Sequence, residues 1–283
     1  MRRAPHALLS ALASLCVAVS AGASAQTPEE IERYKQMTIL SVGLAGVFNA
    51  EPYVGLDNRV LPIPFFAYNK NNLTVGGPNV SYRFWRPLGV QLSAETRFRF
   101  QAYDADDSPF LEGMEGRNGT LELGMRAQKR WDRLRVRGGA FVDVAGQHDG
   151  YQINLQANYE VANGRIASLR PTLGVSYQSQ NIINYYYGVR TGEARTGVSR
   201  GNGTVSDRPT YFGEEAFIPY AGLEGRFRLS RRLQLAGQAR ADFLPTEVTD
   251  SPIIGPSTRY SAFFGVNYLL SGPGVTPRPG DRR

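Results

Sequence analysis

The chain has 283 residues, a formal net charge of +7 and a single cysteine. A basic chain can bind nucleic acid, but a secretory leader and strand-long alternation of apolar and polar residues argue against that class. We therefore expect no nucleic-acid partner. The cysteine, Cys16, lies within the leader, which excludes disulfides and thiolate metal sites from the exported chain. No cofactor is expected.

Residues 1–25 predict a secretory signal peptide. Arg2 and Arg3 supply the basic start, residues 7–19 are a short apolar core, and residues 23–25 are a small-residue cleavage site. The apolar core is too short for a membrane helix, and no later stretch is apolar for the roughly 18 residues that such a helix requires. The chain is therefore expected to leave the cytoplasm without a helical anchor.

Residues 26–37 predict an N-terminal periplasmic segment with a short helix, because Thr27 can cap it and Pro28 suits its first turn. A first strand is expected over residues 38–48. A second is expected over residues 60–68, irregular at its start because Pro62 and Pro64 lack the N–H that a strand ladder needs.

A short hairpin is expected next, with strands over residues 73–76 and 79–85. The following stretch, 88–103, shows the clearest alternation in the chain. Its two faces are apolar Val90, Leu92, Ala94, Thr96, Phe98, Phe100, Ala102 and polar Gln91, Ser93, Glu95, Arg97, Arg99, Gln101. A soluble strand is usually about 5–6 residues long, whereas a tilted membrane strand needs roughly 9–11. This pattern is typical of a barrel with one lipid face and one lumen face.

The same rhythm recurs to the end of the chain. Further strands are expected over residues 120–129, 134–145, 151–161, 169–178, 217–229, 233–243 and 260–270, with a hairpin turn at Asn163–Gly164. We predict an all-β fold, a transmembrane antiparallel up-and-down β-barrel over residues 38–270. It has twelve strands, or ten if the hairpin over residues 60–76 leaves the wall. Residues 271–283 are a basic tail, expected to be disordered.

The connections fall into a short class and a long class, as in outer-membrane barrels with periplasmic turns and external loops. The long ones cover residues 49–58, 103–118, 146–150, 181–209 and 245–257. We therefore predict an outer-membrane location. Contacts with outer-membrane lipid and lipopolysaccharide are expected for the outward face.

The polar faces carry charges of both signs, which are expected to line the lumen because charge facing lipid is costly. The predicted lumen residues are Glu95, Arg97, Arg99, Glu122, Arg126, Arg137, Glu224 and Arg226. Mixed signs favour an interior filled by salt bridges, and a narrow channel is the alternative.

A second set of cations falls near the predicted short turns: Arg86, Lys129, Arg130, Arg133, Arg165, Arg231 and Arg232. Such a basic periplasmic rim can attract acidic cell-wall polymer or partner proteins. Ordinary snorkelling of long side chains at the membrane interface explains it equally well.

Short motifs in the loops and strand ends resemble the MltA-interacting protein (MipA)/OmpV family of outer-membrane proteins. The positions that carry the resemblance are Tyr53, Gly55, Pro62, Pro64, Tyr68, Gly113, Met114, Arg117, His148, Gly150, Tyr186, Tyr187, Gly188, Ser251 and Pro252. Their order and spacing extend over nearly the whole exported chain.

The resemblance implies a non-enzymatic scaffold that links a murein-cleaving lytic transglycosylase with a murein-synthesising penicillin-binding protein. The alternative is a narrow porin or a receptor channel for small solutes or antibiotics, because members of one fold differ in function. A third reading makes His148 and Asp149 the base and orienting residue of a hydrolase, but no G-x-S-x-G elbow accompanies them. The acidic loop of residues 103–117 is either a solvated loop or a site for a divalent cation. Tyr185–Tyr187 are either structural packing or a sugar-stacking platform.

Overall fold

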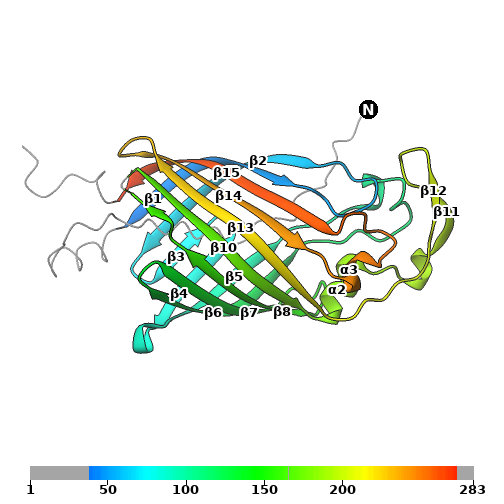
Figure 1. The fold of residues 1–283 in the computed structure, drawn as a ribbon, viewed down its shortest axis with the longest axis horizontal. Coiled ribbons are helices and arrows are strands. Elements are labelled where there is room, and N and C mark those ends of the chain that lie inside the picture. Colours follow the sequence, from blue (N-terminus) through cyan, green and yellow to red (C-terminus); the bar gives the residue numbers. More distant parts are fainter. Residues whose placement is uncertain (1–37, 165, 273–283) are drawn as a thin grey trace, which may run out of the picture.

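The computed structural model of the chain describes residues 38–164 and 166–272. Within them, twelve antiparallel strands close into a barrel, because β1 pairs with both β2 and β15, and β10 pairs with both β8 and β13 (Figure 1). The wall strands are β1 Ile39–Asn49, β2 Arg59–Lys70, β3 Leu73–Gly76, β4 Asn79–Trp85, β5 Gln91–Arg99, β6 Thr120–Trp131, β7 Leu134–Asp143, β8 Tyr151–Tyr159, β10 Ala167–Gln178, β13 Ala216–Arg228, β14 Leu233–Phe243 and β15 Thr258–Ser271.

The predicted strand number of twelve is confirmed. The alternative of ten is wrong, because the hairpin of β2 and β3 is part of the wall: β3 pairs with β2 on one side and with β4 on the other. A two-residue strand, β9 Ala162–Asn163, pairs with β10 beside the end of β8. The predicted signal peptide, the predicted N-terminal helix, Arg165 and residues 273–283 of the tail lie outside the described residues.

The period-two alternation gives the wall its two faces. Large apolar side chains such as Leu44 and Phe264, each 58% exposed, point outward, while Ser41 and Asn267 on the same strands are buried inside. Since successive residues of a strand face opposite sides, the outer surface is an apolar band suited to lipid. Among the described residues, no helix is long and apolar enough to cross a membrane.

The strand predicted over residues 88–103 is shorter than expected, because β5 covers only Gln91–Arg99. At its start, Leu88 and Gly89 have positive φ values of 47° and 77° and form a turn. At its end the chain leaves the wall, and Tyr103 pairs instead with Arg117 in an isolated bridge. Alternation therefore continued in the sequence beyond the residues that pair as a strand.

The prediction that β2 is irregular at its start is wrong. The β1–β2 register is continuous from Asn49↔Arg59 to Ile39↔Asn69, through both prolines. The carbonyl of Phe66 accepts a bond from Gly77 N–H on the side away from β1. Backbone groups of a strand alternate sides, so Pro62 and Pro64 also face away from β1, and their missing N–H groups leave that ladder intact.

The two ends of the barrel differ (Figure 1). One end, here named the turn end, has the short turns, the first residues of β1 and the last residues of β15. The other, the loop end, carries the long connections, which contain α2 Gln180–Tyr187, α3 Thr246–Thr249 and the hairpin of β11 Arg195–Ser199 and β12 Val205–Arg208. Residues 181–209 were expected to be a loop, and the structure instead folds most of them into α2 and this hairpin. Single 3₁₀ turns lie at Pro87–Gly89, Ala105–Asp107 and Thr191–Glu193.

Candidate functional site

The long connections fold together into a cap over the loop end. We name as the cap residues 50–58, 100–119, 144–150, 179–215 and 244–257. Most of the buried apolar cluster belongs to it, namely Tyr53, Val54, Ala102, Tyr103, Phe110, Leu111, Met114, Ile182, Ile183, Tyr186, Tyr187, Val189, Leu244, Val248, Ile253 and Ile254. Four of the five segments, all except residues 144–150, thus share one hydrophobic core outside the barrel wall, which makes the cap a packed layer.

Side-chain to backbone bonds link the cap segments. Tyr53 donates its hydroxyl to the carbonyl of Tyr186 over 3.2 Å, and Ser108 donates to the carbonyl of Val54 over 2.9 Å. Ser251 donates to the carbonyl of Tyr187 over 2.5 Å. Burial raises the pKa of Tyr53, so its hydroxyl stays a neutral donor. The helix α2 ends where Gly188 N–H bonds to the carbonyl of Asn184.

A buried ion pair lies at the centre of the cap. Nη2 of Arg117 is 2.8 Å from Oε2 and 3.0 Å from Oε1 of Glu193. The carboxylate also accepts the backbone N–H groups of Arg190 and Glu115. Burial by itself opposes ionisation of Glu193, but the bonds from Arg117 and these N–H groups outweigh it, and the pKa of Glu193 is lowered.

A second fully buried arginine, Arg208, fastens the β11–β12 hairpin to the rest of the cap. It donates to the backbone carbonyls of Phe110, Glu112 and Glu193. Its guanidinium therefore bonds to peptide carbonyls, and burial lowers its pKa. Arg208 bridges residues almost a hundred positions apart, an arrangement that no local pattern signals.

His148 is buried between the cap and the wall. Its Nδ1 accepts the N–H of Gly150 over 3.0 Å, and its own backbone N–H donates to Asp143 over 2.7 Å. Its Nε2 is 3.5 Å from Oε1 of Glu122. The hydrolase reading paired His148 with Asp149, and the structure places the imidazole between Asp143 and Glu122 instead, with no exposed side-chain atoms. These bonds order the loop around His148. Because the imidazole is fully buried, it cannot reach an external substrate.

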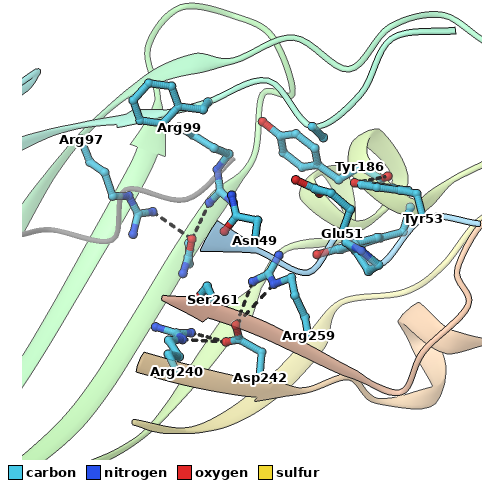
Figure 2. Close-up of a pocket in the computed structure, with 15 residues that line it drawn as sticks. Asn49, Glu51, Tyr53, Arg97, Arg99, Tyr186, Arg240, Asp242, Arg259 and Ser261 are labelled. Atoms are coloured by element: carbon cyan, nitrogen blue, oxygen red, sulfur yellow. Dashed lines mark hydrogen bonds and ion pairs between the residues drawn. The ribbon is translucent and has the colours of Figure 1, made fainter. Parts of the chain in front are cut away.

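Under the cap lies a cavity of about 140 Å³, here named the arginine cavity (Figure 2). Its lining includes Arg97, Arg99, Arg240, Arg259, Asp242, Glu51, Asn49, Phe100, Tyr53, Tyr186 and Gln152. Five strands of the wall and three cap segments therefore meet around one polar chamber.

The cavity arginines are held by two carboxylates. Arg97 and Arg99 both bind Glu122, with Arg99 Nη2 2.9 Å from Oε1. On the opposite wall, Arg240 and Arg259 both bind Asp242, as Figure 2 shows. Counting Glu51 as a third carboxylate, the arginines still outnumber the acids that line or bind at the cavity, so it is suited to an anionic group.

A smaller cavity of about 80 Å³ continues the interior below it, lined in part by Arg126, Arg137 and Glu224. Arg126 pairs with Glu95 at 2.9 Å, and Arg170 lies 4.0 Å from Glu224. The structure thus brings the predicted lumen residues inside the barrel, largely as ion pairs. Arg226, opposite Ala236 on the neighbouring strand, is half-buried there.

The positions that carry the family resemblance fall in two places. Twelve of the fifteen lie in the cap or on α2 and its ends: Tyr53, Gly55, Gly113, Met114, Arg117, His148, Gly150, Tyr186, Tyr187, Gly188, Ser251 and Pro252. The other three, Pro62, Pro64 and Tyr68, lie on β2.

Burial of Tyr186 and Tyr187 favours the packing interpretation of the tyrosine run. In the acidic loop, Asp107 accepts the N–H of Asp104, and Glu115 pairs with Arg190 of another cap segment. No group of His, Cys, Asp and Glu in the described chain is arranged to hold a metal.

The predicted basic rim lies at the turn end, apart from Arg165, which is not described. Arg86, Arg133, Arg231 and Arg232 are exposed in the turns after β4, β6 and β13. Arg130 pairs with Glu160 at 2.6 Å, and Lys129 lies 5.2 Å from the ring centre of Trp131.

Several residues of the site were missed by sequence reasoning. Asp242 and Arg259 belong to strands whose alternation could have placed them inward, two residues after Arg240 and two before Ser261. Glu193 and Arg208 lie in a stretch without any periodic pattern. Only the folded cap reveals that they are buried.

A closed antiparallel barrel with an apolar outer band and paired charges inside defines a β-barrel protein of the bacterial outer membrane. The chain belongs to the MltA-interacting protein MipA family, whose model matches residues 42–270. The predicted family and location are thereby confirmed.

Three relatives illustrate the similarity. The "Putative outer membrane protein YiaT" of Escherichia coli K12 is 27% identical, over 81% of this chain and 90% of that protein. The "MltA-interacting protein" of the same strain is 28% identical over 79% and 88%. The "Outer membrane protein OmpV" of Vibrio cholerae serotype O1 is 24% identical over 69% and 72%. None of these three names states an enzymatic activity.

Proposed function

We propose that this protein is a non-enzymatic scaffold that holds murein-cleaving and murein-synthesising enzymes at the turn end of the barrel. The partners would be a lytic transglycosylase and a penicillin-binding protein. The observation that carries the proposal is the contrast between a loop end closed by a packed cap and a turn end with exposed arginines in three turns. Short turns face the periplasm in such barrels, where murein enzymes work.

The chemistry of the turn end supports this partner class. Arg133 and Arg231 extend from turns without burying their charge, so they can steer acidic protein surfaces or cell-wall polymer. A relative that bears the name MltA-interacting protein makes a transglycosylase the first partner to test. The outward apolar band would contact outer-membrane lipid and lipopolysaccharide.

The test is in-cell crosslinking of the tagged full chain, followed by identification of captured proteins. The variant reverses the exposed charges, with Arg86, Arg133, Arg231 and Arg232 changed to Glu. The matched control is Arg195→Glu, an exposed charge at the loop end. We expect the wild type and the control to enrich transglycosylases or penicillin-binding proteins over an unrelated barrel, and the four-charge variant to lose them. Equal capture by the four-charge variant would refute the role of the rim.

A second candidate function is a narrow channel or small-solute receptor, favoured by the arginine cavity inside the barrel. The distinguishing measurement is single-channel conductance in planar bilayers. A scaffold closed by the cap should be electrically silent, whereas a channel should conduct with anion preference set by Arg97 and Arg99. Silence in the wild type together with conductance after removal of cap residues 195–208 would show that the cap seals a potential pore.

A further inference from the structure

One sector of the barrel wall is incomplete. Between β2 and β5 stand only β3 and β4, and their hairpin turns at Gly77 and Pro78. β3 pairs with β2 only over Ala67–Lys70, and β4 meets β5 only as far as Glu95. In the described structure, no strand therefore lies between Arg59–Phe66 and residues 96–99. We name this sector the wall gap.

The β2 edge of the gap is built to remain unpaired. Pro62 and Pro64 direct their backbone nitrogens toward the gap, as their parity with Phe66 shows. Proline has no N–H, so two of the donors that would stand unpaired in lipid are absent. Prolines on an open edge also disfavour addition of a further strand. A gap with this edge is unsuited to a β-strand partner.

Two side-chain bonds join the β5 edge to the hairpin, one from a side chain of the hairpin and one from a side chain of β5. Asn79 Oδ1 accepts the N–H of Phe98 over 3.1 Å, and Thr96 Oγ1 accepts the N–H of Val80 over 3.0 Å. Side-chain bonds thus take the place of backbone ladder bonds beyond the last β4–β5 pair, Ser81 with Glu95. Two donors are absent from the β2 edge and the N–H of Phe98 is satisfied on the β5 edge, so fewer backbone donors are left unpaired where no strand lies between them.

The surfaces that border the gap are apolar. β2 is apolar on both faces, with Val60 and Phe66 exposed outward and Leu61, Ile63 and Phe65 half-buried inward. No other wall strand carries so continuous an apolar run on its inward face in the described chain. Across the gap, the rings of Phe98 and Phe100 pack edge to face with centroids 4.8 Å apart. An apolar chain can therefore contact apolar side chains all the way through the wall.

The inner side of the gap leads toward positive charge. Phe100, Arg97 and Arg99 of the β5 side line the arginine cavity, and so does Asn49, which pairs with β2 at Arg59. The cavity is thus lined by residues of the β5 flank and, on the other side, by Asn49 of β1, the strand next to β2, and its arginines outnumber its carboxylates. Apolar borders followed by an anion-suited chamber match a molecule with an acyl chain and an anionic headgroup.

We propose that the wall gap is a side portal through which a single-chain amphiphile with a carboxylate or phosphate headgroup passes between the membrane and the arginine cavity. The headgroup binds among Arg97, Arg99 and Arg259, and the acyl chain lies between β2 and the Phe98–Phe100 pair. This site is independent of the turn-end scaffold, so either can fail without the other.

The test follows quenching of a tryptophan at the gap by brominated acyl chains. The reporter is Phe100→Trp, in a full chain whose own tryptophans, Trp85 and Trp131, are changed to Phe. The protein is held in nanodiscs of neutral phosphatidylcholine. The probes are 9,10-dibromostearate, its uncharged methyl ester, and a brominated lysophosphatidylglycerol. Retention of the barrel is checked for each variant by heat-modifiable mobility in gels.

Two glutamate variants locate the portal. Ile63→Glu places a charge on the inward face of β2 beside the gap, and Ala236→Glu places one on the inward face of fully paired β14. We expect saturable quenching by at least one anionic probe, about tenfold weaker binding of the ester, and about tenfold weaker binding of the acid in Ile63→Glu, with Ala236→Glu unchanged. A preference for the stearate or the phosphate probe identifies the headgroup. Equal quenching by acid and ester, unsaturable quenching, or an unaffected Ile63→Glu variant would overturn the proposal.

Discussion

The two ends of the barrel differ in the contacts that hold them together. At the loop end, Ile183 and Arg117 are fully buried within a core built from four separated segments. At the turn end, Leu88 is 92% exposed and the arginines extend into solvent. Each turn is formed by its own few residues, whereas the cap depends on contacts between distant ones. The loop end should therefore respond to substitution as a cooperative unit, and the turn end residue by residue.

The largest loss of cap stability is expected from Arg117→Ala. The variant leaves Glu193 buried without its charged partner, which costs roughly 3–5 kcal/mol. The cap should open while the barrel stays closed. Hydrogen exchange at the amide of Val189, bonded to the carbonyl of Tyr211, reports the opening.

The matched change at the turn end is Arg133→Ala, whose exposed charge has no comparable role, and exchange in the cap should stay at the wild-type rate. If Arg117→Ala left the Val189 amide equally protected, the ion pair would not hold the cap together. The double variant Arg117→Met, Glu193→Gln should be milder than Arg117→Ala, because it leaves no unpaired buried charge.

A pair of apolar truncations compares the two ends directly. Ile183→Ala removes a fully buried side chain of α2 and should destabilise the cap by about 2–5 kcal/mol. Leu88→Ala removes a side chain that is almost fully exposed, and its effect should stay within about 0.5 kcal/mol. Limited proteolysis of residues 190–210 in the folded protein measures the difference. Similar cleavage of both variants would mean that the cap has no core of its own.

Two glycines with positive φ sharpen the comparison further. Gly55 in the cap has φ 78° and would bring a new Cβ against the side chain of Ser108, while Gly89 in a turn has φ 77° with open space around it. Gly89→Ala should cost only the backbone strain, about 1 kcal/mol, and Gly55→Ala should cost more because the clash is added. Thermal melting of each variant in detergent gives the order, and a larger loss from Gly89→Ala would contradict it.

The smallest expected effect is a pH dependence confined to the cap. The pKa of Glu193 is lower in the folded cap than the unfolded value of about 4.3. Its stabilisation is therefore complete above that unfolded value and is lost as pH falls through the folded pKa. Exchange of cap amides should accelerate below about pH 4, and Glu193→Gln should flatten this dependence. Identical acid profiles for the two proteins would exclude Glu193 as the titrating group.

The sequence by itself determined the class of the fold and much of the layout. Period-two alternation is a local property, because each residue's face follows from its neighbours two positions away. It was therefore enough to place twelve strands, to put Glu95 and Arg97 inside, and to separate short turns from long loops. The family motifs, likewise short and local, could be recognised in the same way.

Only the tertiary structure decided what closes and what opens the barrel. Arg117 and Glu193 meet across 76 positions, and such an encounter depends on barrel closure and on the docking of loops. Pro62 and Pro64 are tolerated because their nitrogens face away from β1, on the side where β3 pairs only with Ala67–Lys70. Strand pairing decides this, and composition does not. The cap and the wall gap arise from contacts between segments, and a local pattern carries no information about which distant segment will supply the partner.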